Sequence, residues 1–129
     1  MIRIRKMRGS EHERTDRFIR SIFPRSVVHI DAADTVLLAE TEGKPVGFVH
    51  LLEQEDRMVL QGLGVVKSMR GKGVGTMLME RALELLSRSG KPVYLKVRAL
   101  NQAVNMYARY GFFVHKFGRS HVLVKKPNS

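Results

Sequence analysis

The sequence predicts a mixed α/β (α+β) fold in which a mostly antiparallel central sheet is flanked by helices. Three observations support this prediction: short apolar runs separated by turn residues, a strongly amphipathic stretch after a glycine-rich loop, and a strand-like run directly after that stretch. Short turns favour antiparallel pairing, whereas a strand, a helix and a second strand in succession favour a parallel crossover. The expected element order is βαβββαβαββ.

The first half of the chain begins with a half-buried strand, because apolar and basic residues alternate from residue 2 to residue 7. A helical stripe follows and stops at Pro24, with Ser10 as the expected N-cap. Three further strands, joined by short polar turns, predict an antiparallel meander over residues 35–40, 46–52 and 58–66.

The second half of the chain begins with the glycine-rich loop 70–76. Apolar residues then repeat at helical spacing from Val74 to Leu86, and Gly90 and Pro92 end this pattern. A strand over 93–97 is expected to pair in parallel with the last strand of the meander. The remaining elements are a short helix from Gln102 to Tyr110 and two strands over about 112–117 and 121–125.

The composition is that of a single folded domain. A chain of 129 residues with 43% hydrophobic and 27% charged residues suits one core, so we expect residues 1–129 to form one domain. No apolar run is long enough to cross a bilayer, and no membrane partner is expected. The absence of cysteine excludes a disulfide and a thiol nucleophile and agrees with a cytoplasmic location. The histidines show no metal-ligand spacing, so no metal is predicted.

The formal net charge of +11 predicts attraction to anions over about 8–10 Å at physiological salt. Nucleic acid or the ribosome, an acidic protein and a phosphorylated cofactor are three partners that would explain it. A soluble, self-repelling surface without a partner is the fourth explanation, and charge alone does not choose among them. The charge does argue against a polycationic acceptor such as a polyamine.

The glycine-rich loop Arg70–Thr76 predicts a phosphate site. Glycines let backbone N–H groups approach an anion closely, and the helix that follows adds N–H donors without partners and the positive end of its dipole. Arg70 and Lys72 supply full positive charges. The alternative is a glycine-rich turn whose basic residues are only solvated. The position of the loop between a strand and an amphipathic helix favours phosphate binding over this alternative.

Two common phosphate loops do not match this stretch. A Walker loop requires serine or threonine after its lysine, but Lys72 is followed by Gly73. A dinucleotide fingerprint requires G-x-G-x-x-G and an acidic residue at the end of the next strand, whereas this loop reads G-x-G-x-G and residues 95–98 contain no acid.

Two motifs resemble the signatures of the GNAT superfamily, the acyl-CoA-dependent N-acyltransferases. The stretch Arg70-x-x-Gly73-x-Gly75 is similar to the family's R/Q-x-x-G-x-G/A motif, and Val65 stands where the family has a strand-ending valine. The family's A-x-x-x-Y-x-x-x-G-F signature is matched by Ala103, Tyr107, Gly111 and Phe112. The element order is also the family's, so the resemblance covers almost the whole chain.

The resemblance implies that acetyl-CoA (CoA) enters between the strand ending at Val65 and the strand over 93–97. These strands would splay apart at a bulge near Gly62 or Gly64. Strand backbone would bind the pantetheine arm and stabilise the oxyanion, and the loop would bind the pyrophosphate. The implied cofactor-binding residues are Leu63, Gly64, Val65, Arg70, Gly71, Lys72, Gly73, Val74, Gly75, Thr76, Asn101 and Tyr107.

Tyr107 is the general acid that the resemblance implies. A phenol with an ordinary pKa of about 10 is protonated at neutral pH and can protonate a leaving thiolate. Spacing alone favours a different interpretation, in which Tyr107 is a core aromatic on a short amphipathic helix with its hydroxyl at the surface; the family match favours the acid. Tyr110 and Tyr94 are further tyrosines, but neither has motif support.

The sequence departs from the family pattern at two places. Many relatives carry a glutamate base on the strand before the loop, but residues 58–65 contain no carboxylate and Gln61 is their only polar side chain. Deprotonation would then use water, His50 or Glu53. The family's asparagine usually lies seven residues before the tyrosine, where this chain has Leu100, so a capping role suits Asn101 better than a cofactor contact.

The sequence therefore predicts an N-acetyltransferase that transfers acetyl directly to a primary amine in a ternary complex. The acceptor stays open: a protein N-terminus or lysine, on an acidic or ribosome-associated protein for example, or a small amine. A basic module that binds nucleic acid or the ribosome, and a non-catalytic acyl-CoA-binding regulatory domain, are alternatives. The aromatic content of 7% disfavours nucleic acid, and the missing strand glutamate motivates the regulatory alternative.

Overall fold

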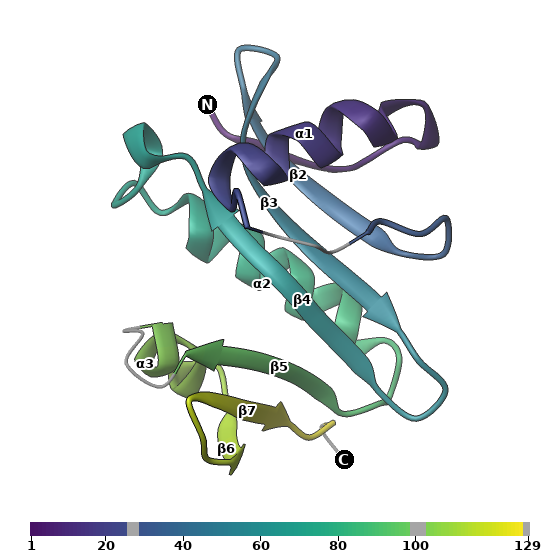
Figure 1. Cartoon of the computed structure of the whole chain (residues 1–129), viewed down its shortest axis with the longest axis vertical. Coiled ribbons are helices and arrows are strands. Elements are labelled where there is room, and N and C mark those ends of the chain that lie inside the picture. Colours follow the sequence, from purple (N-terminus) through teal and green to yellow (C-terminus); the bar gives the residue numbers. More distant parts are fainter. Residues whose placement is uncertain (26–28, 99–102, 128–129) are drawn as a thin grey trace.

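The computed structural model describes residues 1–25, 29–98 and 103–127, and its strands form a seven-stranded sheet in the order β1-β2-β3-β4-β5-β7-β6 (Figure 1). Neighbouring strands are antiparallel except β4 and β5, which are parallel as predicted. The predicted element order is confirmed. The elements are β1 (Arg3–Lys6), α1 (His12–Ile22), β2 (Thr35–Thr41), β3 (Lys44–Glu53), β4 (Met58–Val65), α2 (Val74–Ser87), β5 (Val93–Arg98), α3 (Ala103–Arg109), β6 (Phe113–Lys116) and β7 (Ser120–Lys125), with short 3₁₀ helices η1 (Gly9–Glu11) and η2 (Lys67–Met69).

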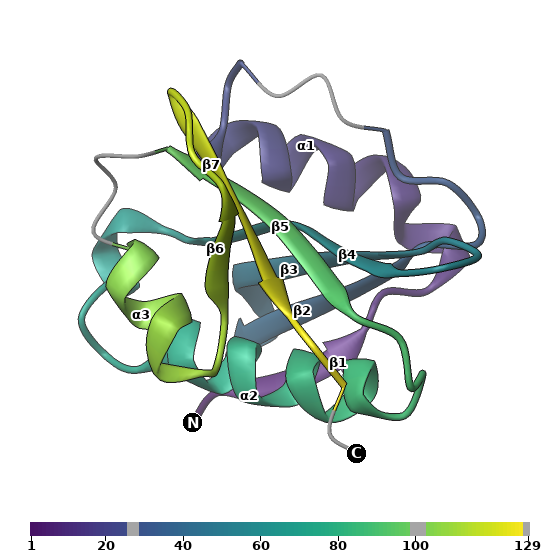
Figure 2. The ribbon, with the colours of Figure 1, turned by 90° about the horizontal axis from the view of Figure 1, so that it is seen from below.

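The helices cover both faces of the sheet: α1 lies on one face, and α2 and α3 lie on the other (Figure 2). Because strand side chains alternate between faces, β2 and β3 contribute to both layers. Leu37 and Val49 pack in the core that contains α2, whereas Val36, Leu38 and Phe48 pack in the core under α1. No helix in the described part of the chain is long and apolar enough to span a bilayer.

The prediction of Ser10 as the N-cap of the first helix is wrong. Ser10 lies inside η1, and α1 begins two residues later at His12. The carboxylate of Glu11 accepts a hydrogen bond from the Arg8 backbone N–H at 2.9 Å, so a glutamate instead of the serine hydroxyl satisfies a backbone donor at this turn.

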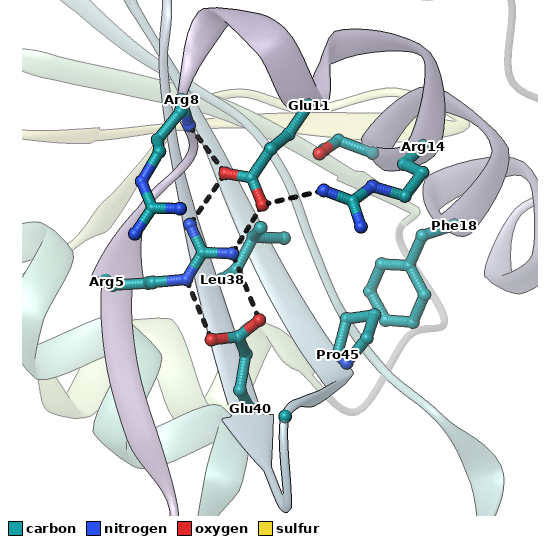
Figure 3. Close-up of a pocket in the computed structure, with 10 residues that line it drawn as sticks. Arg5, Arg8, Glu11, Arg14, Phe18, Leu38, Glu40 and Pro45 are labelled. Atoms are coloured by element: carbon teal, nitrogen blue, oxygen red, sulfur yellow. Dashed lines mark hydrogen bonds and ion pairs between the residues drawn. The ribbon is translucent and has the colours of Figure 1, made fainter.

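Glu11 belongs to a cluster of charged side chains that joins β1, η1 and β2 (Figure 3). The Arg5 guanidinium donates to both oxygens of Glu11, at 2.7 and 2.6 Å, and to both oxygens of Glu40, at 2.7 and 3.1 Å. The hydrogen bonds from Arg5, and after them the one from the Arg8 backbone, lower the pKa of Glu11 from 4.5 to about 2. Only 6% of Glu11 is exposed, so its charge depends on these partners.

Substitution of Glu11 by glutamine is expected to destabilise the fold at pH 7 by up to about 3 kcal/mol, the equivalent of the lowered pKa of its carboxyl. A depressed carboxyl pKa contributes stability above the unfolded value of 4.5, and this contribution is lost as pH falls toward about 2. Urea unfolding should therefore show a difference between parent and variant at pH 7 that shrinks below pH 4.5. Glu13→Gln, at an exposed position two residues later in the first turn of α1, should change stability by less than about 0.5 kcal/mol.

Candidate active site

The strands β4 and β5 separate after two residue pairs. Only Met58 with Val93 and Val59 with Tyr94 are paired, and beyond them the strands diverge (Figure 1). β4 continues to Val65 along β3, while β5 pairs with β7 over its whole length. The edge of β4 that faces β5 is therefore open between Leu60 and Val65. Backbone polar groups in the interior of a sheet need partners, so an open edge there suits a ligand with amide groups.

A bulge in β4 accompanies this separation. His50 pairs with Gly62 and Leu51 pairs with Leu60, so Gln61 is the extra residue on β4. The expectation of a bulge at Gly62 or Gly64 is therefore corrected to Gln61, the residue just before Gly62. Gly62 itself keeps regular pairing, and a Cβ there would make only an ordinary contact, 3.5 Å, with Phe48.

Gly64 is required by close packing under α1. A Cβ at this position would lie 2.8 Å from Phe23, 2.9 Å from Phe48 and 3.0 Å from Ile22. The lack of a side chain at Gly64 therefore lets Ile22 and Phe23, at the end of α1, pack directly on β4 beside its open edge. A glycine predicted to contact the cofactor thus also determines how closely α1 approaches the strand.

Gly64→Ala is expected to destabilise the fold by about 1–3 kcal/mol, because the methyl group forces aromatic side chains out of their rotamers. Thermal unfolding measures this effect. Gly62→Ala is the matched control on the same strand, since its methyl group has room. Equal stability of the two variants would contradict the packing argument.

A cavity of about 560 Å³ occupies the opening between β4 and β5. It brings together two predicted site residues, Leu63 and Tyr107, with five further residues of β3 and β4. The lining residues are Ile19, Phe23, Ile30, Phe48, His50, Leu60, Gln61, Gly62, Leu63, Leu95, Lys96, Val97, Ala103, Met106 and Tyr107.

α3 places Tyr107 in this cavity. Only 8% of the residue is exposed, its ring meets Phe112 edge-on at 5.7 Å, and burial raises the pKa of its phenol above the ordinary value of 10. Gly111, with φ at +93°, reverses the chain after α3, and the Phe112 N–H donates to the Tyr107 carbonyl at 3.2 Å. The spacing Y-x-x-x-G-F thus has a local reason: it folds Phe112 back against Tyr107.

The glycine loop lies at the far end of the open edge and does not line the cavity. Gly71 and Gly73 have φ values of +77° and +84°, which side chains rarely adopt, and Gly73 is the N-cap of α2. The Met77 N–H donates to the Gly73 carbonyl at 3.0 Å, as the first bond of that helix. The backbone N–H groups from Val74 to Thr76 have no acceptor within the helix, so they present donors at its positive end.

The loop is tied to the end of β4. The Arg70 Nε donates to the Val65 carbonyl at 3.1 Å, and a Cβ on Gly75 would lie 3.8 Å from Val65 and 3.9 Å from Leu63. Lys72 is exposed, while Val74 is buried in the core under α2. The predicted loop residues therefore lie beside the predicted residues at the end of β4, and Val74 is the one among them whose side chain is in the core.

Of the two side chains proposed as a base, only His50 reaches the cavity. Glu53 is 61% exposed and pairs with Lys91 at 2.9 Å outside the cavity. The His50 ring is 2% exposed and lies 2.8 Å from the Asp34 carboxylate. Asp34 escaped sequence reasoning, because it lies 16 residues from His50 in an irregular segment that carries no motif.

The other predicted candidates lie elsewhere. Tyr94 stacks under the Arg57 guanidinium, 4.0 Å from the ring centre, in a neighbouring pocket, and Tyr110 does not line the cavity. Asn101 lies outside the described residues.

Solved structures of acetyltransferases share this architecture. The ribosomal-protein-S18-alanine N-acetyltransferase from Escherichia coli superposes with a TM-score of 0.82 and 18% identity, covering 100% of this chain and 96% of that chain. The PaiA N-acetyltransferase from Thermoplasma acidophilum, in complex with coenzyme A, gives a TM-score of 0.79 at 18% identity over 98% and 99% of the two chains. At such identity the likeness shows the fold.

A curated relative and a family model add sequence evidence. The uncharacterized N-acetyltransferase MJ1207 of Methanocaldococcus jannaschii is 32% identical over 88 residues, which are 61% of this chain. The match spans only 39% of that relative's length. The model of the acetyltransferase (GNAT) family matches residues 3–112, and the protein therefore belongs to that family.

Proposed function

We propose that this protein is an N-acetyltransferase that moves the acetyl group of acetyl-CoA to a primary amine, with residues 1–129 as its single catalytic domain. The observation that carries this proposal is the open edge of β4. It runs from a cavity lined by Tyr107 to the glycine loop at the start of α2. A cytoplasmic location stays a prediction from the sequence.

The residues along this edge fit acetyl-CoA. The backbone of Leu63, Gly64 and Val65 offers hydrogen-bond partners to the amides of the pantetheine arm. The N–H groups of the loop from Gly71 to Thr76, with Arg70 and Lys72, suit the pyrophosphate. Charge-assisted hydrogen bonds contribute about 1.5–3 kcal/mol each, so three or four are enough for micromolar affinity.

The transfer reaction gives a role to Tyr107 and to the backbone of β4. Acetyl-CoA supplies the acetyl group as a thioester. Tyr107 donates its phenolic proton to the leaving sulfur, and a backbone N–H of β4 stabilises the negative charge on the carbonyl oxygen. The raised pKa of Tyr107 keeps the phenol protonated through the neutral range. The chain has no cysteine, which agrees with direct attack by the amine.

The acceptor is an amine on a protein N-terminus, on a lysine, or in a small molecule. The net charge of +11 favours an acidic or ribosome-associated protein over a polycation. The likeness to an enzyme named for ribosomal protein S18 alanine supports a peptide N-terminus as the first acceptor to test.

The test is a transfer assay with acetyl-CoA and a panel of peptides with free N-termini, lysine peptides and small amines. Release of the CoA thiol and the mass of the acetylated product are both measured. Acetylation of any member, with a product of the expected mass, supports the proposal. Binding of acetyl-CoA without transfer to any amine would favour the non-catalytic regulatory domain. No binding of acetyl-CoA would contradict the proposal and favour the basic module that binds nucleic acid or the ribosome.

A further inference from the structure

We propose that His50 is the general base of the transfer and that Asp34 positions it. This inference rests on the proposed function and supplies the base that β4 lacks. His50 comes from β3, and Asp34 comes from the segment before β2. The two side chains are 2% and 6% exposed, so their contact is shielded from solvent.

Hydrogen bonding determines which ring nitrogen is available. The Nε2 atom of His50 lies 2.8 Å from the Asp34 Oδ2 atom, which also accepts from the Asp31 backbone N–H at 3.0 Å. An ionised carboxylate only accepts, so in the neutral imidazole that a base requires Nε2 carries the proton and Nδ1 keeps its lone pair. His50 lines the cavity, and the proposal assigns the attacking amine to Nδ1, the ring nitrogen that does not contact Asp34.

The two proposed proton-transfer groups approach the cavity from opposite faces of the sheet. His50 pairs with Val36 across β2 and β3, and Val36 packs in the core under α1. Tyr107 belongs to the core that contains α2. Both line the opening between β4 and β5. The base must reach the attacking nitrogen, which adds to one face of the planar thioester carbonyl, and the acid must reach the sulfur. Groups on different walls of the cavity can serve these two atoms.

The surroundings of His50 contain few other charges. Asp34 is the carboxylate in contact with it. On the other walls of the cavity the titratable residues are Lys96 on β5, which is exposed, and Tyr107 on α3. The lining residues from α1 and β4 are uncharged, and Gln61 is the polar one among them.

The proton balance is complete with these two groups. The nitrogen of a neutral amine forms the new bond to the carbonyl carbon and passes its excess proton to Nδ1 of His50. The carbon–sulfur bond breaks, and the sulfur takes the Tyr107 proton. The imidazolium and the phenolate then return to their starting states through solvent, and the products are the amide and the free thiol.

The experiment compares the parent with His50→Gln and Asp34→Asn, using an acceptor identified in the transfer assay. Glutamine can still donate toward Asp34 but does not accept a proton usefully. We expect His50→Gln to lower kcat about 100-fold and to remove the rise of activity with pH that an imidazole base produces. Asp34→Asn should lower kcat about 10-fold, because the ring loses its preferred tautomer. The KM for acetyl-CoA should not change in either variant.

His121→Gln is the matched control, since it makes the same change at a histidine outside the cavity. Acetyl-CoA should raise the melting temperature of all variants, which shows that they fold and bind. A kcat within about 3-fold of the parent and an unchanged pH profile in His50→Gln would overturn the inference. If His50→Gln does not fold, Asp34→Asn decides by the same readouts. A parent that acetylates no amine refutes the proposed function and the base together, whereas an active, unaltered variant refutes the base alone.

Discussion

Replacing Gly73 by glutamate is expected to abolish the stabilisation of this protein by acetyl-CoA. At a concentration 100 times the dissociation constant, a ligand that binds only the folded state stabilises it by about 2.7 kcal/mol, which raises the melting temperature by several degrees. A carboxylate on Gly73 would stand at the N-terminus of α2, where the proposal places the pyrophosphate. Charge repulsion then opposes the cofactor directly. Thermal unfolding of parent and variant, with and without acetyl-CoA, measures the effect.

The control for this experiment is Gly43→Glu. Gly43 has φ at +77°, close to the +84° of Gly73, and a Cβ at either position would have open space around it. Both variants therefore carry the strain of a left-handed side chain, about 1–2 kcal/mol, and both should melt below the parent without ligand. Only Gly43→Glu should keep the ligand-dependent rise. A normal rise in Gly73→Glu would remove the glycine loop from the cofactor site.

Replacing Tyr107 by phenylalanine is expected to lower kcat by about 100-fold or more, the usual contribution of a general acid. The KM for acetyl-CoA should not change, because the ring still packs against Phe112. Stability should change little, since the variant keeps the buried ring and its contact with Phe112 and loses only the hydroxyl. Steady-state kinetics and thermal unfolding of the same preparation separate the two effects.

Burial of Tyr107 also predicts the pH dependence of the parent. Desolvation disfavours the phenolate and raises the pKa of this side chain above 10. The acid form therefore persists through neutral and moderately alkaline pH, and activity should not decline on account of this group until above pH 10. Tyr110→Phe, at a tyrosine that does not line the cavity, should stay within about 2-fold of the parent. Full activity in Tyr107→Phe would leave protonation of the sulfur to water.

Local patterns were sufficient to predict most of the architecture. The period of the apolar residues in α2, the turn chemistry between β2 and β3, and the spacing from Tyr107 to Phe112 each depend on neighbours in sequence. The element order and the parallel pairing of β4 with β5 followed from them. The glycine-rich turn before α2 was predictable for the same reason, because the positive φ angles at Gly71 and Gly73 are a local requirement for glycine.

Predictions failed where a distant residue competes with a local preference. Ser10 is a good N-cap by type, but α1 begins at His12, and the Glu11 carboxylate accepts the Arg8 backbone N–H. Arg5 from β1, which also binds Glu40 on β2, donates to this carboxylate. The bulge lies at Gln61, where the register between β3 and β4 shifts, and a register belongs to two strands together and not to a glycine on one of them. Neither outcome is encoded in a short window of sequence.

The sequence by itself determined the family, the phosphate-type loop and the tyrosine of the candidate site, because each of these is carried by a short motif. Only the tertiary structure decided which side chains share the cavity with Tyr107. In the structure Glu53 pairs with Lys91 outside the cavity, so it is excluded as the base. Asp34, from the segment before β2, contacts His50 on β3. The physical reason is that a buried hydrogen bond between side chains depends on burial and on contact between distant segments, and neither is visible until the sheet has formed.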